Sequence, residues 1–302
     1  MANTRELRRR IKSVKNISQI TRAMQMVAAT KMRRAQNQAV EGRPYNENLS
    51  QALQRLLPSV ETEGHPLLLG NESNKIGIIL LSTDKGLVGA LNTNLIRLLL
   101  ASHAGDGNVV YYTVGKKGRS FVVRTGKELI ADFENKDVIT FRQAVQLSKL
   151  AIEAFNKGEI GQVLLVYPQF VSTIKQEAKI VKLLPIRLED VILNEAQAHL
   201  RGETKVSSGV HLGGVTSQEF LFEPNVDALL EALLIHHIQT KIYQALLETK
   251  ASEHSARMVA MKNATDNAKE LVEDLNLTYN QTRQASITTE LLEITTASIA
   301  ME

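Results

Sequence analysis

Glycine and proline are absent from both ends of this 302-residue chain. All seventeen Gly and all six Pro lie between Gly42 and Pro224, so residues 1–41 and 225–302 contain neither. Because these two residues most often end or break helices, the distribution predicts two helical ends around a centre of shorter elements. At 1.5 Å per residue, the C-terminal segment alone would form a helix of about 117 Å. That length favours a coiled coil.

The N-terminal segment carries an amphipathic stripe, with apolar residues three or four positions apart. We expect its buried face to comprise Leu7, Ile11, Val14, Ile17, Ile20, Met24, Val27 and Ala28. Gly42 and Pro44 are expected to loosen or kink this helix. Helix is then expected to resume as far as Pro58, through Leu49, Leu53, Leu56 and Leu57.

The C-terminal segment is expected to be one long helix with a heptad seam. Asn225 is its candidate N-cap, and Asp227 lies in the first turn, where the helix dipole favours an acid. Alternating steps of four and three predict a left-handed supercoil with a partner helix. The predicted seam is Leu247, Ala251, His254, Met258, Met261, Thr265, Ala268, Val272, Leu275 and Tyr279.

The two ends carry opposite charge. Residues 1–43 hold eleven Lys/Arg and two acids, a net +9, whereas residues 225–302 hold six Lys/Arg and eleven acids, a net −5. Two helices that attract each other and join one central domain are expected to pair antiparallel. A basic arm that binds nucleic acid is an alternative interpretation, although the aromatic residues that would stack on bases are missing.

The extreme C-terminus should extend beyond the paired region. Even if the first helix reaches residue 57, roughly the final twenty residues of the last helix would project alone. This end carries several large apolar side chains, each worth ~1.5–3 kcal/mol when buried. Either the end frays or another protein encloses it, and the sequence leaves both open.

The centre alternates short apolar runs with amphipathic segments, which is typical of an open α/β layer. Strands are predicted over 75–83, 108–115, 162–170 and 178–186, and helices over 91–100 and 141–159. A polar loop or hairpin insertion is expected over 194–218.

Signals of catalysis are weak. Gly86 and Gly89 follow a predicted strand and precede a helix, which hints at a phosphate-binding loop, but the chain has no dinucleotide fingerprint and no P-loop motif. We expect the basic turn 115–118 to be solvated. His236 and His237 are adjacent and cannot form an i, i+4 metal pair. We therefore predict no catalytic residue, no cofactor and no metal site, and a nucleotide-binding α/β enzyme stays an alternative.

Composition excludes further classes of site. The chain has no cysteine, so disulfides, thiolate nucleophiles and Cys-based metal centres are impossible. No apolar run approaches the ~20 residues that a membrane helix needs. Residues 1–15 lack the apolar core of a secretory signal.

Four segments carry a recognisable pattern: SQITRAMQMVAATKMRRAQ (18–36), TDKGLVGALN (83–92), ASEHSARMVAMKNATDNA (251–268) and NQTRQASITTELLEI (280–294). They resemble the γ subunits of F-type rotary ATP synthases, bacterial type. The resemblance covers essentially the whole chain, except that residues 194–218 match no motif of that family.

The resemblance implies an α/β fold class, with a long antiparallel coiled coil of the N- and C-terminal helices plus a Rossmann-like open α/β domain. The corresponding domain limits are 1–60 for the N-terminal helix, 72–222 for the α/β domain with its insertion 194–218, and 225–302 for the C-terminal helix.

The resemblance also implies a non-catalytic central rotor stalk. Such a subunit transmits rotation of a membrane c ring to three catalytic β subunits and so couples ion translocation to ATP synthesis or hydrolysis. The implied partners are three α and three β subunits, the ε subunit and the c-subunit ring, with no nucleic acid. Membrane association would occur only through the complex, at the cytoplasmic face of the bacterial membrane.

Individual residues match functional positions of the family. Those expected to contact β and to contribute to coupling are Met24, Arg257, Arg283, Gln284, Thr288 and Glu290. Those expected to be held at the end of the shaft, in a hydrophobic sleeve, are Ile287, Leu291, Leu292 and Ile294.

Overall fold

A computed structural model describes residues 4–56, 65–103, 108–186 and 226–301. These residues form long N- and C-terminal helices and a central α/β sheet, which confirms the predicted fold class. The chain divides into two compact units. The helical unit comprises Met1–Lys31, Leu87–Gly89 and His254–Glu302, and the sheet unit comprises Met32–Gly86 and Ala90–Glu253. The predicted domain limits stay a prediction.

The sheet unit is built on five strands in the order β3-β2-β1-β4-β5. Their bounds are β1 Ile76–Leu81, β2 Val109–Val114, β3 Glu128–Phe133, β4 Gln162–Phe170 and β5 Gln176–Leu184. The first four strands are mutually parallel, and β5 returns antiparallel to β4. β1 is central, with Ile78 opposite Tyr111 on one side and Leu164 on the other.

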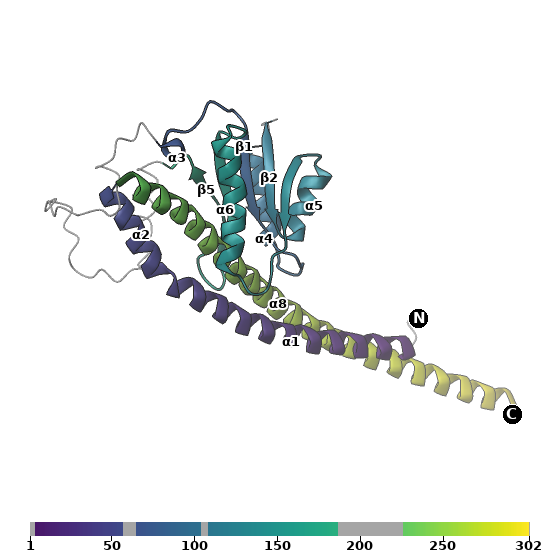
Figure 1. Ribbon diagram of the computed structural model, residues 1–302. Helices are drawn as coiled ribbons and strands as arrows, with labels where there is room; N and C mark the ends of the chain where they lie inside the picture. The colour runs from purple at the N-terminus through teal and green to yellow at the C-terminus, as the bar shows by residue number, and fades with distance from the viewer. Residues whose placement is uncertain (1–3, 57–64, 104–107, 187–225, 302) are drawn as a thin grey trace. The chain divides into compact units, whose positions relative to one another are not determined.

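Helices cover both faces of this sheet (Figure 1). α4 (Leu91–His103) and α5 (Lys116–Arg124) close one face, where Leu95, Leu99 and Val122 contact strand residues such as Tyr111. α6 (Phe141–Asn156) closes the other face together with the part of α8 within this unit. Strands buried on both faces need continuous apolar sequence, and β1 and β2 have it.

β3 was not predicted, because its sequence ELIADF alternates exposed and half-buried residues instead of forming an apolar run. It is the edge strand beside β2. An edge strand contacts the core with every second residue only, so a search for apolar runs does not find it.

The remaining helices are α1 (Thr4–Glu41), α2 (Arg43–Leu56), α3 (Pro66–Leu69) and α8 (Val226–Met301). A single residue, Gly42, separates α1 from α2, in agreement with the expected loosening at this position. The structure describes α2 as far as Leu56. The candidate N-cap Asn225 and the insertion 194–218 lie outside the described residues.

Candidate functional site

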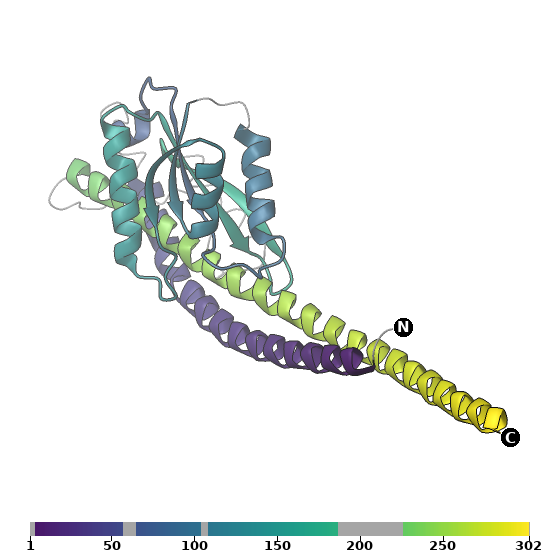
Figure 2. The same cartoon turned by 90° about the vertical axis from the view of Figure 1, so that its right-hand side faces the viewer.

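In the helical unit α1 and α8 pair antiparallel along an apolar seam. Leu7, Ile11 and Val14 of α1 form one buried cluster with Ala268 and Leu275 of α8. Figure 2 shows the two helices side by side, with the end of α8 continuing past the start of α1. Ala268 and the other small seam residues let the two helix backbones approach closely, so the distance between the helix axes is small.

Two polar contacts fix the register of the pair. The hydroxyls of Thr21 and Thr265 lie 2.7 Å apart, and both side chains are buried. The Arg8 guanidinium donates a hydrogen bond to the Tyr279 hydroxyl at 2.9 Å and lies 5.7 Å from the centre of that ring. Arg8 pairs with Tyr279, and the later residue Thr21 pairs with the earlier residue Thr265. Residue numbers therefore rise along α1 as they fall along α8, as antiparallel helices require.

The seam predicted on α8 is confirmed, but the stripe predicted on α1 is wrong at three positions. Ile17, Ile20 and Val27 are 49%, 59% and 56% exposed. The seam instead follows the buried and half-buried positions Leu7, Ile11, Val14, Ser18, Thr21, Gln25 and Ala28, and Met24 beside it is also half-buried. The seam positions keep a strict alternation of four and three, which a supercoiled partner demands. One residue along a helix turns a side chain by about 100°, so Ile17 and Ile20 leave the seam.

The displaced residues form an outward apolar stripe on α1. Ile17, Ile20, Met24 and Val27 recur at helical spacing, and Met24 is half-buried while the others are exposed. Met24, a candidate contact residue, therefore lies in an apolar surface rather than a polar one. These residues were predicted to belong to the buried face of the helix, and the structure places them on its outer face.

The end of α8 extends as a bare helix with an apolar surface. Ile287, Leu291, Leu292 and Ile294 are 47%, 58%, 60% and 67% exposed. Since the α1 residue Arg8 already contacts Tyr279, the residues after about 283 have no α1 counterpart. The expected projecting end is confirmed, and α8 stays helical as far as Met301.

The threonines of this end satisfy their hydroxyls within the helix. From Thr278 onward, all six donate to backbone carbonyls three or four residues earlier: Thr278, Thr282, Thr288, Thr289, Thr295 and Thr296. This bonding satisfies the hydroxyls without raising the low helix propensity of threonine.

Most of the candidate polar residues lie on this bare end. Arg283, Gln284, Thr288 and Glu290 are exposed. Arg257 is different, because it is half-buried and its Nη1 lies 3.5 Å from Nδ1 of the buried His254. The structure thus groups four of the six candidate residues at the projecting end and leaves Arg257 and Met24 on the paired part.

The basic residues of α1 face outward. All eleven Lys/Arg of residues 1–43 except Arg43, whose side chain is outside the described set, are exposed. They are Arg5, Arg8, Arg9, Arg10, Lys12, Lys15, Arg22, Lys31, Arg33 and Arg34. The paired helices therefore present a strongly positive surface around the apolar stripe.

The carboxyl edge of the sheet is the place where a nucleotide would bind in this topology. Here the first N–H groups of α5 are already used: Gly118 donates to Ser82 Oγ at 2.8 Å, Lys117 to the Thr83 carbonyl at 3.0 Å and Lys116 to Asp84 Oδ1 at 2.9 Å. A helix N-terminus whose donors are occupied offers no phosphate cradle.

Glycine is required in this turn. Gly115 has φ +100°, and a Cβ there would lie 2.4 Å from the Ser82 carbonyl oxygen. Lys116 and Lys117 are exposed as expected, but the predicted turn is wrong, because these residues begin helix α5 after Gly115; the two glycines that flank them are buried.

Helix α8 closes the same edge with its own side chains. The Lys250 ammonium donates to the Asn135 carbonyl at 3.0 Å and pairs with Glu253 at 3.2 Å, and both side chains are almost fully buried. Ser252 donates to the Pro168 carbonyl at 2.9 Å. Asn135 in turn donates to the Ser82 carbonyl at 2.7 Å. The polar groups of Lys250, Ser252 and Asn135 at this edge are therefore bonded within the chain.

The adjacent histidines have separate surroundings. Burial, with Lys241 and His236 nearby, lowers the pKa of His237 to about 3, so it is neutral at physiological pH. His236 Nε2 contacts the Tyr45 hydroxyl. In the part of the chain that the structure describes, no three His, Asp or Glu side chains form a metal-binding group. Nor is any helix among those residues long and apolar enough to cross a bilayer.

The chain matches the family described as ATP synthase over residues 3–301. It is 44% identical to the ATP synthase gamma chain of Methylacidiphilum infernorum, with both chains fully covered. It is 43% identical to the ATP synthase gamma chain of Opitutus terrae over 99% of each chain, and 42% identical to that of Akkermansia muciniphila over the whole of both.

Solved structures resemble its fold. A chain of the Euglena gracilis mitochondrial ATP synthase, in an OSCP/F1/c-ring structure, aligns with a TM-score of 0.66 at 23% identity, covering 99% of this chain and 94% of the other. A chain of the rotor of the same synthase aligns with a TM-score of 0.63 at 22% identity, covering 94% and 98%.

Proposed function

Since the chain belongs to the ATP synthase gamma-chain family over its full length, we propose that its paired terminal helices are the shaft of the central rotor stalk. The chain is a non-catalytic subunit of an F-type ATP synthase. Rotation of a membrane ring of c subunits would reach the three catalytic β subunits through this shaft. The occupied carboxyl edge of the sheet supports a role without nucleotide chemistry of its own.

The observation that carries the proposal is the bare apolar end of α8. Ile287, Leu291, Leu292 and Ile294 are each about half exposed or more, yet each would contribute ~1.5–3 kcal/mol if fully buried. A single helix with such a surface is best stabilised inside another protein. We infer that a ring of three α and three β subunits encloses this end.

Contacts with β would involve two parts of the shaft. The exposed Arg283, Gln284, Thr288 and Glu290 are available at the projecting end. Met24, in the outward stripe of α1, and Arg257 of α8 lie on the part of the shaft where the two helices are paired. We propose that these residues bear on β and transmit torque, with the exposed cations of α1 facing acidic segments of β.

The other partners and the location follow from the family. We propose that the sheet unit binds the ε subunit and the c ring. The complex would then place this chain at the cytoplasmic face of the bacterial membrane, attached to the membrane only through the other subunits.

The test is reconstitution. The chain is mixed with separately prepared α and β subunits, and the mass of the complex and its ATPase rate are followed together. We expect one copy of this chain for three α and three β subunits, and an ATPase rate that depends on it. A matched variant with Ile287, Leu291 and Leu292 changed to Ser should assemble less stably. Failure to assemble or to stimulate ATPase activity would contradict the proposal.

A further inference from the structure

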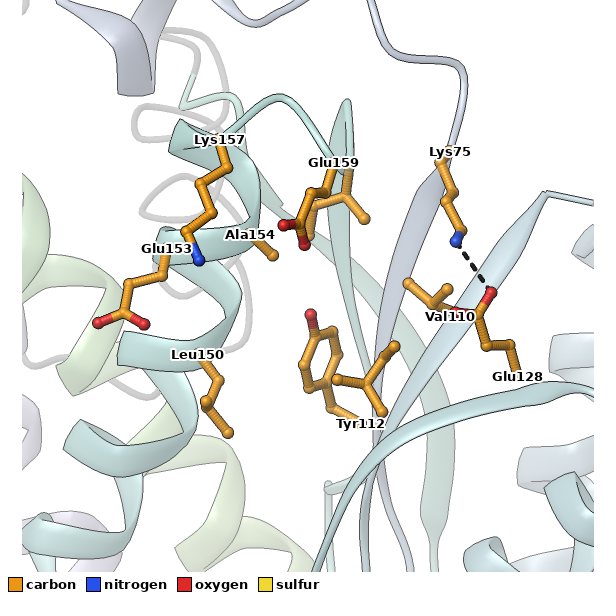
Figure 3. A pocket seen from close by; sticks show the side chains of 11 residues that line it. Lys75, Val110, Tyr112, Glu128, Leu150, Glu153, Ala154, Lys157 and Glu159 are labelled. Carbon is orange, nitrogen blue, oxygen red and sulfur yellow. Dashed lines mark ion pairs between the residues drawn. The ribbon is translucent and has the colours of Figure 1, made fainter.

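The sheet unit contains a cavity of about 320 Å³ at the amino ends of its parallel strands, away from the edge that α8 closes. Figure 3 shows it between α6 and strand β2, with charged side chains around its mouth and Tyr112 at its floor. Ile130, Leu150 and Ala154 give it an apolar wall. Its size suits a small group of atoms rather than a whole nucleotide.

Tyr112 points its hydroxyl into this cavity although the residue is only 2% exposed. No hydrogen bond joins that hydroxyl to any residue that the structure describes. The ring is buried but its hydroxyl is open to the cavity, so a donor that enters the cavity can reach the phenol oxygen. Gly77 makes room for the arrangement, because a Cβ there would lie 2.9 Å from Ile160 and 3.6 Å from the Tyr112 ring.

The charge around the cavity favours a cation. Its lining includes three carboxylates, from Glu128, Glu153 and Glu159, and two ammonium groups, from Lys75 and Lys157. Lys75 is bound to Glu128 at 2.9 Å, and Figure 3 shows the Lys157 ammonium turned away from Tyr112, toward Glu153. The Glu159 carboxylate lies above the Tyr112 hydroxyl in the same view. Burial, and then Glu159 and Glu128, raise the pKa of Tyr112, so the phenol stays neutral.

Glu159 is held in place by the end of α6. Gly158, with φ +73°, lets its own N–H donate to the Phe155 carbonyl at 3.0 Å, and the Glu159 N–H donates to the Ala154 carbonyl at 3.0 Å. This is the Schellman arrangement of a helix C-terminus. The Asn71 amide donates to the Phe155 and Ile160 carbonyls and ties the same loop to the chain before β1. The C-terminal end of a helix dipole itself favours a positive group nearby.

We propose that this cavity binds a guanidinium or primary ammonium group on a short apolar stem. The cationic head would donate to Glu159 and to the Tyr112 oxygen, and the stem would contact Ile130 and Leu150. The cation belongs either to a free small molecule or to an Arg or Lys side chain of a neighbouring subunit. The inference does not depend on the proposed function.

The probe is propylguanidinium, titrated into the full chain labelled with 3-fluorotyrosine and followed by fluorine NMR. The six tyrosines give separate reporters, and Tyr112→Phe assigns the signal of Tyr112. We expect a saturable change in the chemical shift of this signal and no change in the other five. Constant shifts of the other five also show that the probe does not unfold the chain. Propylurea, which is neutral, and butyrate, which is anionic, should leave the signal unmoved.

Two matched variants locate the effect. Glu159→Gln should weaken propylguanidinium binding at least fivefold, because it removes the charge above Tyr112. Glu177→Gln, the same change on β5 outside the cavity, should leave affinity within twofold. The proposal is wrong if the shift does not saturate, if propylurea moves the signal equally, or if both variants weaken binding alike.

The source of the cation is then tested in the assembled complex. If a neighbouring subunit supplies an Arg or Lys, the Tyr112 signal will already be shifted and will not respond to propylguanidinium. If the natural ligand is a free small molecule, the signal will respond as in the isolated chain. Either result supports a cation site, whereas binding that is absent from both samples overturns it.

Discussion

Thr21 and Thr265 form a hydroxyl pair 2.7 Å apart in the buried seam between α1 and α8. Each hydroxyl also lies within bonding distance of a carbonyl of its own helix, Ser18 for Thr21 and Met261 for Thr265. Since each hydroxyl has one hydrogen, one threonine donates across the seam while the other donates to its own backbone. The pair thus joins the helices without leaving a hydroxyl hydrogen unbonded.

Thr21→Val should destabilise the paired helices by about 1–2 kcal/mol, because it removes a buried hydroxyl from a satisfied pair. Replacing both threonines by Val should cost less than the sum of the two single changes, since no partner is left unsatisfied. Chemical unfolding of the four chains in a double-mutant cycle measures the difference. Strict additivity would show that the two hydroxyls do not interact.

Met24→Lys should leave assembly with α and β intact but weaken coupling. The change places a cation in the outward apolar stripe beside Ile20 and Val27, where it would pair with acids of β. Ions moved per ATP hydrolysed, measured in membrane vesicles that carry the complex, should fall. Gln19→Lys, an exposed change outside that stripe, is the control. Normal ion movement in the Met24 variant would contradict a role for this surface.

Shortening the chain from Ile287 onward should weaken the complex more than the fold of the isolated chain. These residues are exposed in the helical unit, so their loss removes little buried area from the chain itself. Thermal unfolding of the chain should shift by a few degrees at most, while dissociation of the complex becomes faster. Comparable losses in both measurements would show that the end belongs to the chain's own core.

Lys250→Met should destabilise the sheet unit by about 3–5 kcal/mol, because it removes the ammonium group that pairs with the buried Glu253 carboxylate. Changing Lys250 to Met and Glu253 to Leu together should recover most of that loss. The control is Lys149→Met, which breaks an exposed pair with Glu153 and should cost under about 1 kcal/mol. Denaturant titration of each variant measures these differences. A double variant as unstable as the single one would exclude the buried Glu253 charge as the cause.

His237 should make stability depend on pH. Its pKa is about 3 in the folded chain and 6.5 for an ordinary histidine, so between these values the unfolded chain binds more protons. The stabilisation is complete above pH 6.5 and falls by about 1.4 kcal/mol per unit as pH drops toward 3. Compared with His237→Gln, the wild-type chain should lose about 2 kcal/mol between pH 7 and 5. Parallel pH profiles would show that the pKa of His237 is the same in the folded and the unfolded chain.

The sequence was sufficient to predict the helices and strands whose pattern of apolar residues does not depend on which element packs against them. β1 is apolar throughout because both its faces are covered, and the seam of α8 kept its heptad even where a position is Thr265 or His254. Thr21 was missed on α1 because its apolar neighbour Ile20 matched an amphipathic helix equally well. Only the partner helix selects the strict period, and no property of α1 alone reveals it.

The same reasoning applies to the sites. Exposure of Ile287 and Leu291 could be predicted from the unequal lengths of the two terminal helices. The cavity at Tyr112 could not, because it depends on Lys75 and on residues from β2, β3 and the end of α6 that meet only after the sheet forms. The occupied N-terminus of α5 likewise required the loop after β1, where Ser82, Thr83 and Asp84 supply its acceptors.

The six threonines near the end of α8 have a mechanical consequence. Each hydroxyl hydrogen is committed to a carbonyl of the same helix, so these side chains have no donor left to point at an enclosing wall. Hydrogen bonds are directional, whereas contacts between methyl groups are not. The threonines therefore add no donor whose energy depends on the angle of the helix, and angle-dependent contacts with an enclosing ring are left to Arg283, Gln284 and Glu290.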